Sequence, residues 1–342
     1  MPKSKIVKLM KLYGILLIIF AINSCGSAQQ TVPDFDSTKA LAEKGDITAQ
    51  ANLASMYING DHVHQDYTEA VKWLLKAADN GNADSEYNLG LCYDEGLGVP
   101  LDYNKSLEWY QKAAQNGSQA AMVNIGVMYF QGEGAEQDYS KALNWFQKAA
   151  SAKLPIACDY IGIIYSQGDG VLIDKNEAVK WFRKGAEGGS VWAQTELGMR
   201  YLFGNGLATN NVEALNWFQK ASDQGYARAQ VDLGTMYLNG WGVATNFQKA
   251  IQLFRQSAEQ GNASGEEKLG YCYLRGCGVD KNPVQAYKWL TLAARQGVPE
   301  AIAATEALSQ NMTPETIAEG FREANAFVPH PKIFASEPKQ LM

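Results

Sequence analysis

The chain has 342 residues, more than one compact core usually organises, so two domains or a repeat array are expected. Hydrophobic residues make up 46% of the chain and charged residues 19%, which excludes a wholly disordered protein. The formal net charge is -6, and residues 1–24 contribute four lysines and no acid, so the remainder carries -10. An acidic chain of this kind argues against nucleic acid as a ligand, because nucleic-acid binding needs a basic surface.

The N-terminus has the pattern of a secretory signal. Four lysines precede an unbroken apolar run over residues 12–22, and a run of 11 residues is too short to span a bilayer as a helix. The segment Ile22-Asn23-Ser24-Cys25 resembles the lipobox of bacterial lipoproteins. This resemblance implies that residues 1–24 are a cleaved signal peptide and that Cys25 receives the lipid anchor. The alternative is a plain signal peptide, or an uncleaved anchor, with an incidental cysteine.

The residues after the cysteine bear on localisation and on the start of the folded part. Gly26, in place of Asp, follows the cysteine, so by analogy with Gram-negative sorting we expect the outer membrane in preference to the inner one. Residues 25–37 are mostly polar and are predicted to be a flexible tether.

Residues 38–297 contain a 36-residue repeat that recurs seven times without gain or loss of a residue. Glycine, tyrosine and tryptophan each recur at this period, with Lys153 interrupting the glycines and Leu253 the tryptophans. The series are Gly45, Gly81, Gly117, Gly189, Gly225, Gly261 and Gly297; Tyr57, Tyr93, Tyr129, Tyr165, Tyr201, Tyr237 and Tyr273; and Trp73, Trp109, Trp145, Trp181, Trp217 and Trp289.

Each repeat is predicted to contain two helices. In the second repeat, apolar residues at helical spacing predict a first helix over 84–95, and Gly96 and Gly98 end it. Asp102 is placed to cap a second helix over 103–115. A glycine also recurs inside the first helices, at Gly90, Gly126, Gly162, Gly198, Gly234 and Gly270. Because glycine destabilises a helix interior, its recurrence predicts that a Trp or Phe of the second helix packs closely there.

The repeat resembles the Sel1-like repeat family, a relative of tetratricopeptide repeats. The fourth repeat shows the signature in Ile161-Gly162, Tyr165, Gly168, Gly170-Val171, Asp174, Ala178, Trp181-Phe182 and Ala186. The first repeat departs from it, because Ala54 and His62 replace glycines. The resemblance covers about residues 38–310. It implies an all-α fold, a right-handed α-solenoid of tandem helix-turn-helix repeats, and an adaptor that binds other proteins.

Two further helices are predicted after Gly297, the first over 298–311 and the second ending at 326. Thr313 is placed as the N-cap of the second helix and Pro314 in its first turn. We predict that residues 298–326 cap the repeat array and that residues 327–342, with three prolines, form a flexible tail.

A second apolar stripe lies beside the core stripe of the first helices, which in tandem helix pairs of this kind line the concave face. Such positions on a solvated helix are usually polar, so this stripe predicts a groove for a peptide or for a helix of a protein partner. Its members are Tyr87, Leu91, Val123, Val127, Phe130, Asp159, Ile163, Met199, Leu202, Phe203, Leu238, Tyr271 and Leu274. Two alternatives stay open: superhelical curvature buries the stripe against neighbouring repeats, or the groove joins two copies of the chain.

Four basic residues lie on first helices in the C-terminal half: Arg200, Arg228, Lys268 and Arg275. They are interpreted either as a patch for a carboxylate of the partner or as an ordinary solvated face.

Residues able to carry catalysis or bind metal are sparse. His62 and His64 with Asp61 and Asp66 could form only a weak metal site, and we predict no metal and no cofactor. Cys272 and Cys277 are close enough in sequence for a disulfide to be considered. Nucleophile, phosphate-loop and dinucleotide motifs are absent from the sequence, so we predict no catalytic residue and no enzymatic activity.

The sequence therefore predicts a lipid-anchored repeat scaffold that mediates protein-protein interaction at the bacterial cell envelope. The alternative is a periplasmic binding protein or hydrolase for cell-wall-related ligands, as described for cysteine-rich relatives, and Asp94, Glu95, Asp159 and Glu196 are its acidic candidates.

Overall fold

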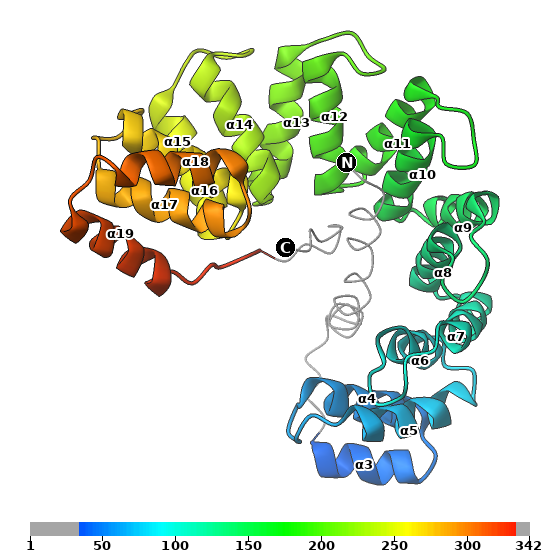
Figure 1. Ribbon diagram of the computed structural model, residues 1–342. Coiled ribbons are helices and arrows are strands. Elements are labelled where there is room, and N and C mark those ends of the chain that lie inside the picture. Colours follow the sequence, from blue (N-terminus) through cyan, green and yellow to red (C-terminus); the bar gives the residue numbers. More distant parts are fainter. Residues whose placement is uncertain (1–33, 333–342) are drawn as a thin grey trace. The chain divides into compact units, whose positions relative to one another are not determined.

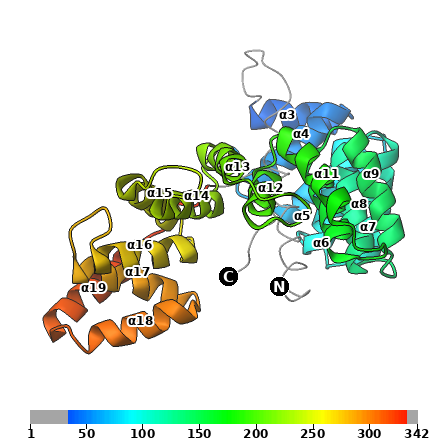
Figure 2. The ribbon, with the colours of Figure 1, turned by 90° about the horizontal axis from the view of Figure 1, so that it is seen from above.

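The computed structural model describes residues 34–332, which contain seventeen helices and no strand (Figures 1 and 2). The chain divides into two compact units, with the boundary between Asp174 and Lys175. Unit 1 denotes residues 34–174 and unit 2 residues 175–332. The all-α class predicted from the 36-residue period is confirmed.

The helices follow one another as alternating first and second helices of each repeat. Unit 1 contains α3 (Phe35–Glu43), α4 (Ile47–Asn59), α5 (Tyr67–Ala78), α6 (Ala83–Glu95), α7 (Tyr103–Gln115), α8 (Gln119–Gln131), α9 (Tyr139–Ser151) and α10 (Pro155–Gln167). Unit 2 contains α11 (Lys175–Glu187), α12 (Val191–Phe203), α13 (Asn211–Asp223), α14 (Ala227–Asn239), α15 (Phe247–Glu259), α16 (Ala263–Arg275), α17 (Pro283–Arg295), α18 (Pro299–Ser309) and α19 (Pro314–Ala326). The first helices are α4, α6, α8, α10, α12, α14 and α16, and the second helices are α5, α7, α9, α11, α13, α15 and α17.

The loop between the two helices of a repeat is closed by the recurring tyrosine. In all seven repeats the backbone N–H of the residue before the second helix donates to the tyrosine carbonyl oxygen at 2.8–3.0 Å. The donor and acceptor pairs are Asp66 and Tyr57, Asp102 and Tyr93, Asp138 and Tyr129, Asp174 and Tyr165, Asn210 and Tyr201, Asn246 and Tyr237, and Asn282 and Tyr273. The backbone of this loop is therefore the same in every repeat.

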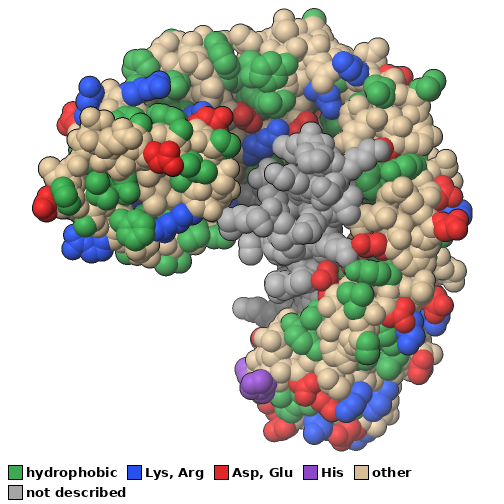
Figure 3. All heavy atoms as spheres, in the orientation of Figure 1, with side chains coloured by type: hydrophobic (Ala, Val, Ile, Leu, Met, Phe, Trp, Pro, Cys, Tyr) green, Lys and Arg blue, Asp and Glu red, His purple; other side chains and the backbone are tan. Residues whose placement is uncertain are grey.

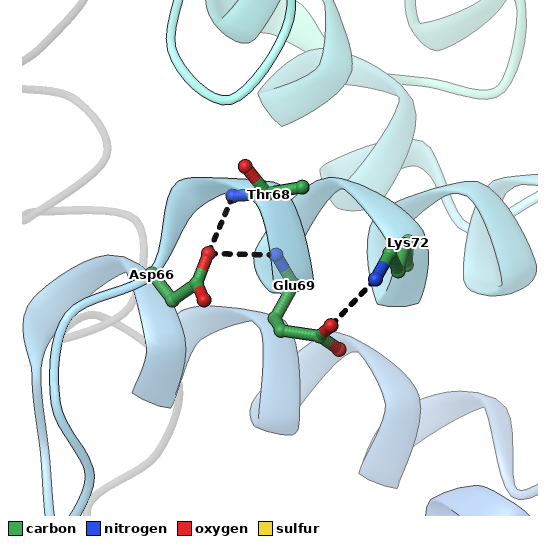
Figure 4. A network of polar contacts seen from close by, with 4 residues as sticks. All are labelled: Asp66, Thr68, Glu69 and Lys72. Carbon is green, nitrogen blue, oxygen red and sulfur yellow. Dashed lines mark hydrogen bonds and ion pairs between the residues drawn. The ribbon is translucent and has the colours of Figure 1, made fainter.

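The residue before the second helix also acts as its N-cap. Asp66 Oδ1 accepts from the backbone N–H groups of Thr68 and Glu69 at 2.9 and 3.0 Å (Figure 4). Asp102, Asp138, Asn210, Asn246 and Asn282 make the same kind of cap. The cap predicted at Asp102 is confirmed.

The glycine inside the first helix permits close packing of the second helix. A Cβ added to Gly126 would lie 2.6 Å from the ring of Phe146, and one added to Gly234 would lie 2.7 Å from the ring of Phe254. The predicted close approach is confirmed, and in both repeats the packed ring is the phenylalanine of the second helix. In the first repeat Ala54 takes the glycine position, and Leu74, a smaller side chain, takes the phenylalanine position.

A polar pair with a buried acceptor recurs at the opposite end of the repeats of unit 2. Gln224 Nε2 donates to Gln194 Oε1 at 2.9 Å, and Gln260 Nε2 donates to Gln230 Oε1 at 2.9 Å. In the last repeat a carboxylate replaces the acceptor amide, and Gln296 Nε2 donates to Glu266 Oε2 at 2.8 Å.

Two loop positions lack the glycine that a left-handed backbone favours. His62 has φ 58° and Lys153 has φ 63°, whereas the remaining residues with positive φ in the described chain are glycines. Both lie in unit 1, at positions where other repeats carry glycine.

The start of the array differs from the sequence prediction. Residues 35–37 were assigned to the tether, but α3 begins at Phe35. The physical reason is the contact between Phe35 and Tyr57, whose rings lie edge to face at 5.7 Å and cover the exposed side of α4. The signal peptide and the rest of the predicted tether lie outside the described residues.

The C-terminal cap follows the prediction closely. Thr313 caps α19 through a bond from the N–H of Thr316, and Pro314 is its first residue. The predicted tail is narrower than residues 327–342, because Phe327 packs edge to face on Trp289 at 5.1 Å and the His330 N–H donates to the Glu259 carbonyl at 2.8 Å. Residues 333–342 lie outside the described residues.

Candidate partner-binding surface

Neighbouring first helices of unit 2 contact one another. Helix α14 packs against its second helix α15 and also contacts the next first helix, α16. Arg228 of α14 pairs with Glu196 of α12, so side chains of these three first helices lie near one another.

The predicted groove residues of unit 1 are mostly buried. Tyr87 and Leu91 belong to the hydrophobic core, with 3% and 0% of their surface exposed. The members in α8 and α10 are Val123, Phe130, Asp159 and Ile163, which are buried, and Val127, which is half-buried. For Tyr87 and Leu91 the structure matches the alternative in which neighbouring repeats cover the stripe.

The predicted groove residues of unit 2 are more open. Phe203, the last residue of α12, has 64% of its surface exposed. The half-buried members are Met199, Leu202, Leu238, Tyr271 and Leu274. Unit 2 thus presents an apolar stripe to which a partner has access, while the groove as a whole stays a prediction.

A charged cluster borders this stripe. Arg228 Nη1 of α14 lies 3.1 Å from Glu196 Oε1 of α12, and both side chains are half-buried. Asp232 lies one turn after Arg228 and has a buried oxygen, Oδ2, with no hydrogen-bond partner among the described residues. Burial raises the pKa of Asp232 to about 6; Arg228 opposes this shift and Glu196 adds to it.

Arg200 lies at the other end of this cluster. Its guanidinium lies 4.4 Å from the ring centroid of Phe182, and 7% of the residue is exposed. Burial lowers the pKa of Arg200, and Glu196 opposes the shift. Its Nε has no hydrogen-bond partner among the described residues. The cluster therefore combines buried polar atoms of both charges, Asp232 Oδ2 and Arg200 Nε, beneath the partly exposed Glu196–Arg228 pair.

The other two basic candidates are surface groups. Lys268 Nζ lies 3.3 Å from Glu267, and the Arg275 guanidinium lies 5.2 Å from the ring centroid of Tyr271. Both side chains are partly or fully exposed, which fits the interpretation of these residues as an ordinary solvated face. Arg200 and Arg228 are more buried than that interpretation predicts.

Sequence reasoning missed Asp232. It lies one 36-residue period after Glu196 and occupies the same position of the repeat. Comparison of equivalent positions across repeats would have found it, because unit 1 has no charged residue at this position.

The acidic candidates for catalysis do not share one unit. Asp94 and Glu95 end α6 and Asp159 lies in α10, whereas Glu196 lies in α12 of unit 2 and pairs with Arg228. Among residues 34–332 no group of three or more His, Cys, Asp or Glu side chains could hold a metal ion.

The two C-terminal cysteines have free thiols. Burial raises the pKa of Cys272 to about 12, so its thiol is protonated at neutral pH. The disulfide considered between Cys272 and Cys277 is therefore not formed in the structure. Within the described range, no helix is long and apolar enough to cross a membrane.

Tandem two-helix repeats with an open stripe on their first helices define a helical-repeat solenoid. The Sel1 repeat family model matches the chain over residues 47–82, 83–118, 119–154, 155–190, 193–226, 227–262 and 263–298. The chain belongs to the Sel1 repeat family, as the resemblance in its sequence indicated.

Solved structures show the same fold. A Sel1 repeat protein from Oxalobacter formigenes is 32% identical, with a TM-score of 0.68, over 87% of this chain and 86% of that one. The protein c5321, a protective antigen of uropathogenic Escherichia coli with this repeat fold, is 33% identical, with a TM-score of 0.59, over 86% of this chain and 72% of that one. No curated protein matches the chain.

Proposed function

We propose that the protein is a scaffold that binds a protein partner along the first helices of unit 2. Sel1 repeat proteins generally mediate protein-protein interaction, and this chain carries seven such repeats. The observation that supports this surface is the open apolar stripe of α12, α14 and α16 beside the Glu196–Arg228 pair. Apolar contacts would supply affinity, and the buried charges would select the partner, since a mismatched group leaves them unpaired.

Site-specific photo-crosslinking in intact cells tests this surface. A benzophenone side chain would replace Leu202 or Leu238 on the first helices, and Asn216 or Gln256 as exposed controls on the second helices. We expect one discrete crosslinked protein from the first-helix positions and none from the controls. Equal crosslinking from both sets, or from the controls alone, would contradict the surface.

A matched substitution separates binding from folding. Leu202→Asp together with Leu238→Asp should abolish the crosslink formed from Met199, because it places two charges in the apolar stripe. Asn216→Asp together with Gln256→Asp adds the same charge on the second helices and should leave the crosslink intact. Circular dichroism would verify that both variants retain their helices.

We further propose that the scaffold is held at the cell envelope, at the outer membrane in preference to the inner one, through a lipid on Cys25. The proposal is supported by the lysine-rich start, the short apolar run and the lipobox-like segment ending at Cys25. Metabolic labelling with palmitate should mark the wild-type chain and not Cys25→Ser, with a Cys92→Ser control labelled normally. Labelling of Cys25→Ser would refute the anchor.

A further inference from the structure

The loops that join first to second helices differ between repeats in one respect. In the fifth and sixth repeats, residues 203–212 and 239–248 contain no charged side chain. The corresponding loops of the other five repeats each contain at least one acid, from Asp61 in the first to Asp280 in the seventh. The two uncharged loops are consecutive in unit 2.

Large apolar side chains project from these two loops. The exposed fractions are 64% for Phe203, 55% for Val212, 39% for Trp241 and 48% for Phe247. The loops touch, since a Cβ added to Gly242 would lie 2.7 Å from the carbonyl oxygen of Asn211. Figure 3 shows hydrophobic side chains at the surface along the upper edge of unit 2, where these loops lie. We call residues 203–212 and 239–248 the apolar edge.

A basic pocket adjoins the apolar edge. It has a volume of about 490 Å³, and its lining includes Asn246, Lys249, Gln252 and Arg255. In unit 1 the equivalent lysines pair with the aspartate that caps their helix: Lys105 lies 3.8 Å from Asp102, and Lys141 3.4 Å from Asp138.

The capping residue of α15 is Asn246 instead, so Lys249 has no carboxylate within ion-pair distance among the described residues. The acids nearest along the chain are Glu213, directly after the first loop, and Asp232, seven residues before the second. The lining of the pocket contains Lys249 and Arg255 and no acid, so the pocket has a net positive charge beside Phe247.

From these features we infer that the apolar edge rests on a lipid surface, with Trp241 and Phe247 in the interfacial region and Lys249 and Arg255 near lipid phosphates. Tryptophan and phenylalanine are favoured at the boundary between headgroups and acyl chains, and basic side chains beside them attract anionic lipids. Phe203, Val212 and Phe247 stand at helix ends and Trp241 in the turn between α14 and α15. None of the four lines the adjoining pocket, and such separate apolar side chains suit a fluid surface better than a rigid protein partner.

Unit 1 supplies a matched control. Leu172 and Ile173 are 90% and 62% exposed in the loop of the fourth repeat, so their apolar surface is at least as open as that of Trp241. That loop also carries Asp169 and Asp174, which an anionic surface repels. If exposure alone caused adsorption, this pair would insert as well.

Fluorescence quenching by brominated lipids tests the inference. The full chain is mixed with vesicles of phosphatidylethanolamine and phosphatidylglycerol whose acyl chains are brominated, and the emission of its eight tryptophans is followed. We expect quenching in the wild type and loss of the quenched component in Trp241→Phe, which removes the reporter and keeps an aromatic ring. Phe203→Ser with Phe247→Ser should reduce the quenching of Trp241, and Leu172→Ser with Ile173→Ser should not.

The charge contribution is tested in the same assay. Lys249→Gln should weaken the dependence of quenching on the phosphatidylglycerol fraction, by about fivefold in vesicle affinity. Equal quenching of wild type and Trp241→Phe would overturn the inference, as would an equal loss in the Leu172 and Ile173 variant. A Trp241 that is shielded by a protein partner and never quenched by lipid would also overturn it.

Discussion

The second helices of unit 1 and unit 2 begin with the same geometry and different chemistry. Asp66, Asp102 and Asp138 cap α5, α7 and α9 of unit 1, and Asn210, Asn246 and Asn282 cap α13, α15 and α17 of unit 2. An aspartate and an asparagine oxygen accept the same backbone N–H groups with similar stability. The substitution therefore removes negative charge from one edge of unit 2 without altering its loops. The recurring residues specify the backbone, and the positions between them specify what each unit contacts.

The largest effect is expected at a packing contact that occurs in the same form inside each unit. Gly126→Ala in unit 1 and Gly234→Ala in unit 2 each place a Cβ against a phenylalanine ring, at 2.6 and 2.7 Å. Each should lower the free energy of unfolding by about 1–3 kcal/mol, as overpacking of a core does. Urea unfolding of both variants measures this, and clearly unequal losses would show that the units do not share one packing scheme.

The same packing predicts a rescue. Adding Phe146→Leu to Gly126→Ala recreates the Ala54 and Leu74 combination of the first repeat, where both side chains are fully buried. The double variant should recover part of the lost stability, which a double-mutant cycle would detect as coupling. Additive losses would contradict this account.

A smaller effect is expected at Glu266, which stands at the position that Gln194 and Gln230 occupy in other repeats. Burial raises the pKa of Glu266 to about 7, although the bond from Gln296 opposes the shift. Ionisation is therefore less favourable in the folded state, and stability should fall as the pH rises from about 4.5 to about 7. Glu266→Gln matches Gln194 and Gln230, so it should remove this slope and stabilise unit 2 by roughly 1–2 kcal/mol at neutral pH. Thermal melts at pH 5 and pH 8 provide the measurement, and an unchanged slope would argue against a buried, titrating Glu266.

The strained loop positions of unit 1 have no counterpart in unit 2. Lys153 at φ 63° occupies a position that is glycine in the other repeats, including Gly225 and Gly261. Lys153→Gly should raise the free energy of unfolding by about 1 kcal/mol, because a left-handed backbone costs a non-glycine residue about that much. Gly225→Lys, the reverse change, should lower it. Differential scanning calorimetry would record both shifts, and destabilisation by Lys153→Gly would mean that the lysine side chain has a contact worth more than the strain.

Sequence reasoning anticipated the fold well because it depends on periodic residues. Glycine, tyrosine and capping positions that recur every 36 residues gave the helix order, the Asp102 cap and the Thr313-Pro314 start of α19. The beginning of α3 was missed, because this helix precedes the first repeat signature; Phe35 packs there on Tyr57.

The candidate surface was less accessible to sequence reasoning. Leu91 and Met199 occupy the same position of the repeat, yet Leu91 is fully buried in the core and Met199 is half-buried. That difference in burial arises from how neighbouring helices pack in each unit. The spacing of apolar residues along one helix does not predict it. The apolar edge was also missed, because its distinguishing feature is that two loops lack the charged residues that the other loops contain.

The change with the smallest expected effect on stability tests the difference between the aspartate and asparagine caps most directly. Asn246→Asp should place a carboxylate near Lys249, as Asp138 lies 3.4 Å from Lys141 in unit 1. Because both residues cap a helix well, the free energy of unfolding should change by no more than roughly 0.5 kcal/mol. Quenching of Trp241 by anionic brominated vesicles should nevertheless fall, since the new carboxylate neutralises one of the two positive charges of the pocket, those of Lys249 and Arg255. Asp138→Asn, the converse change in unit 1, should leave this quenching as it is. If Asn246→Asp left quenching unchanged at constant stability, the difference in caps between the units would have no role at a lipid surface.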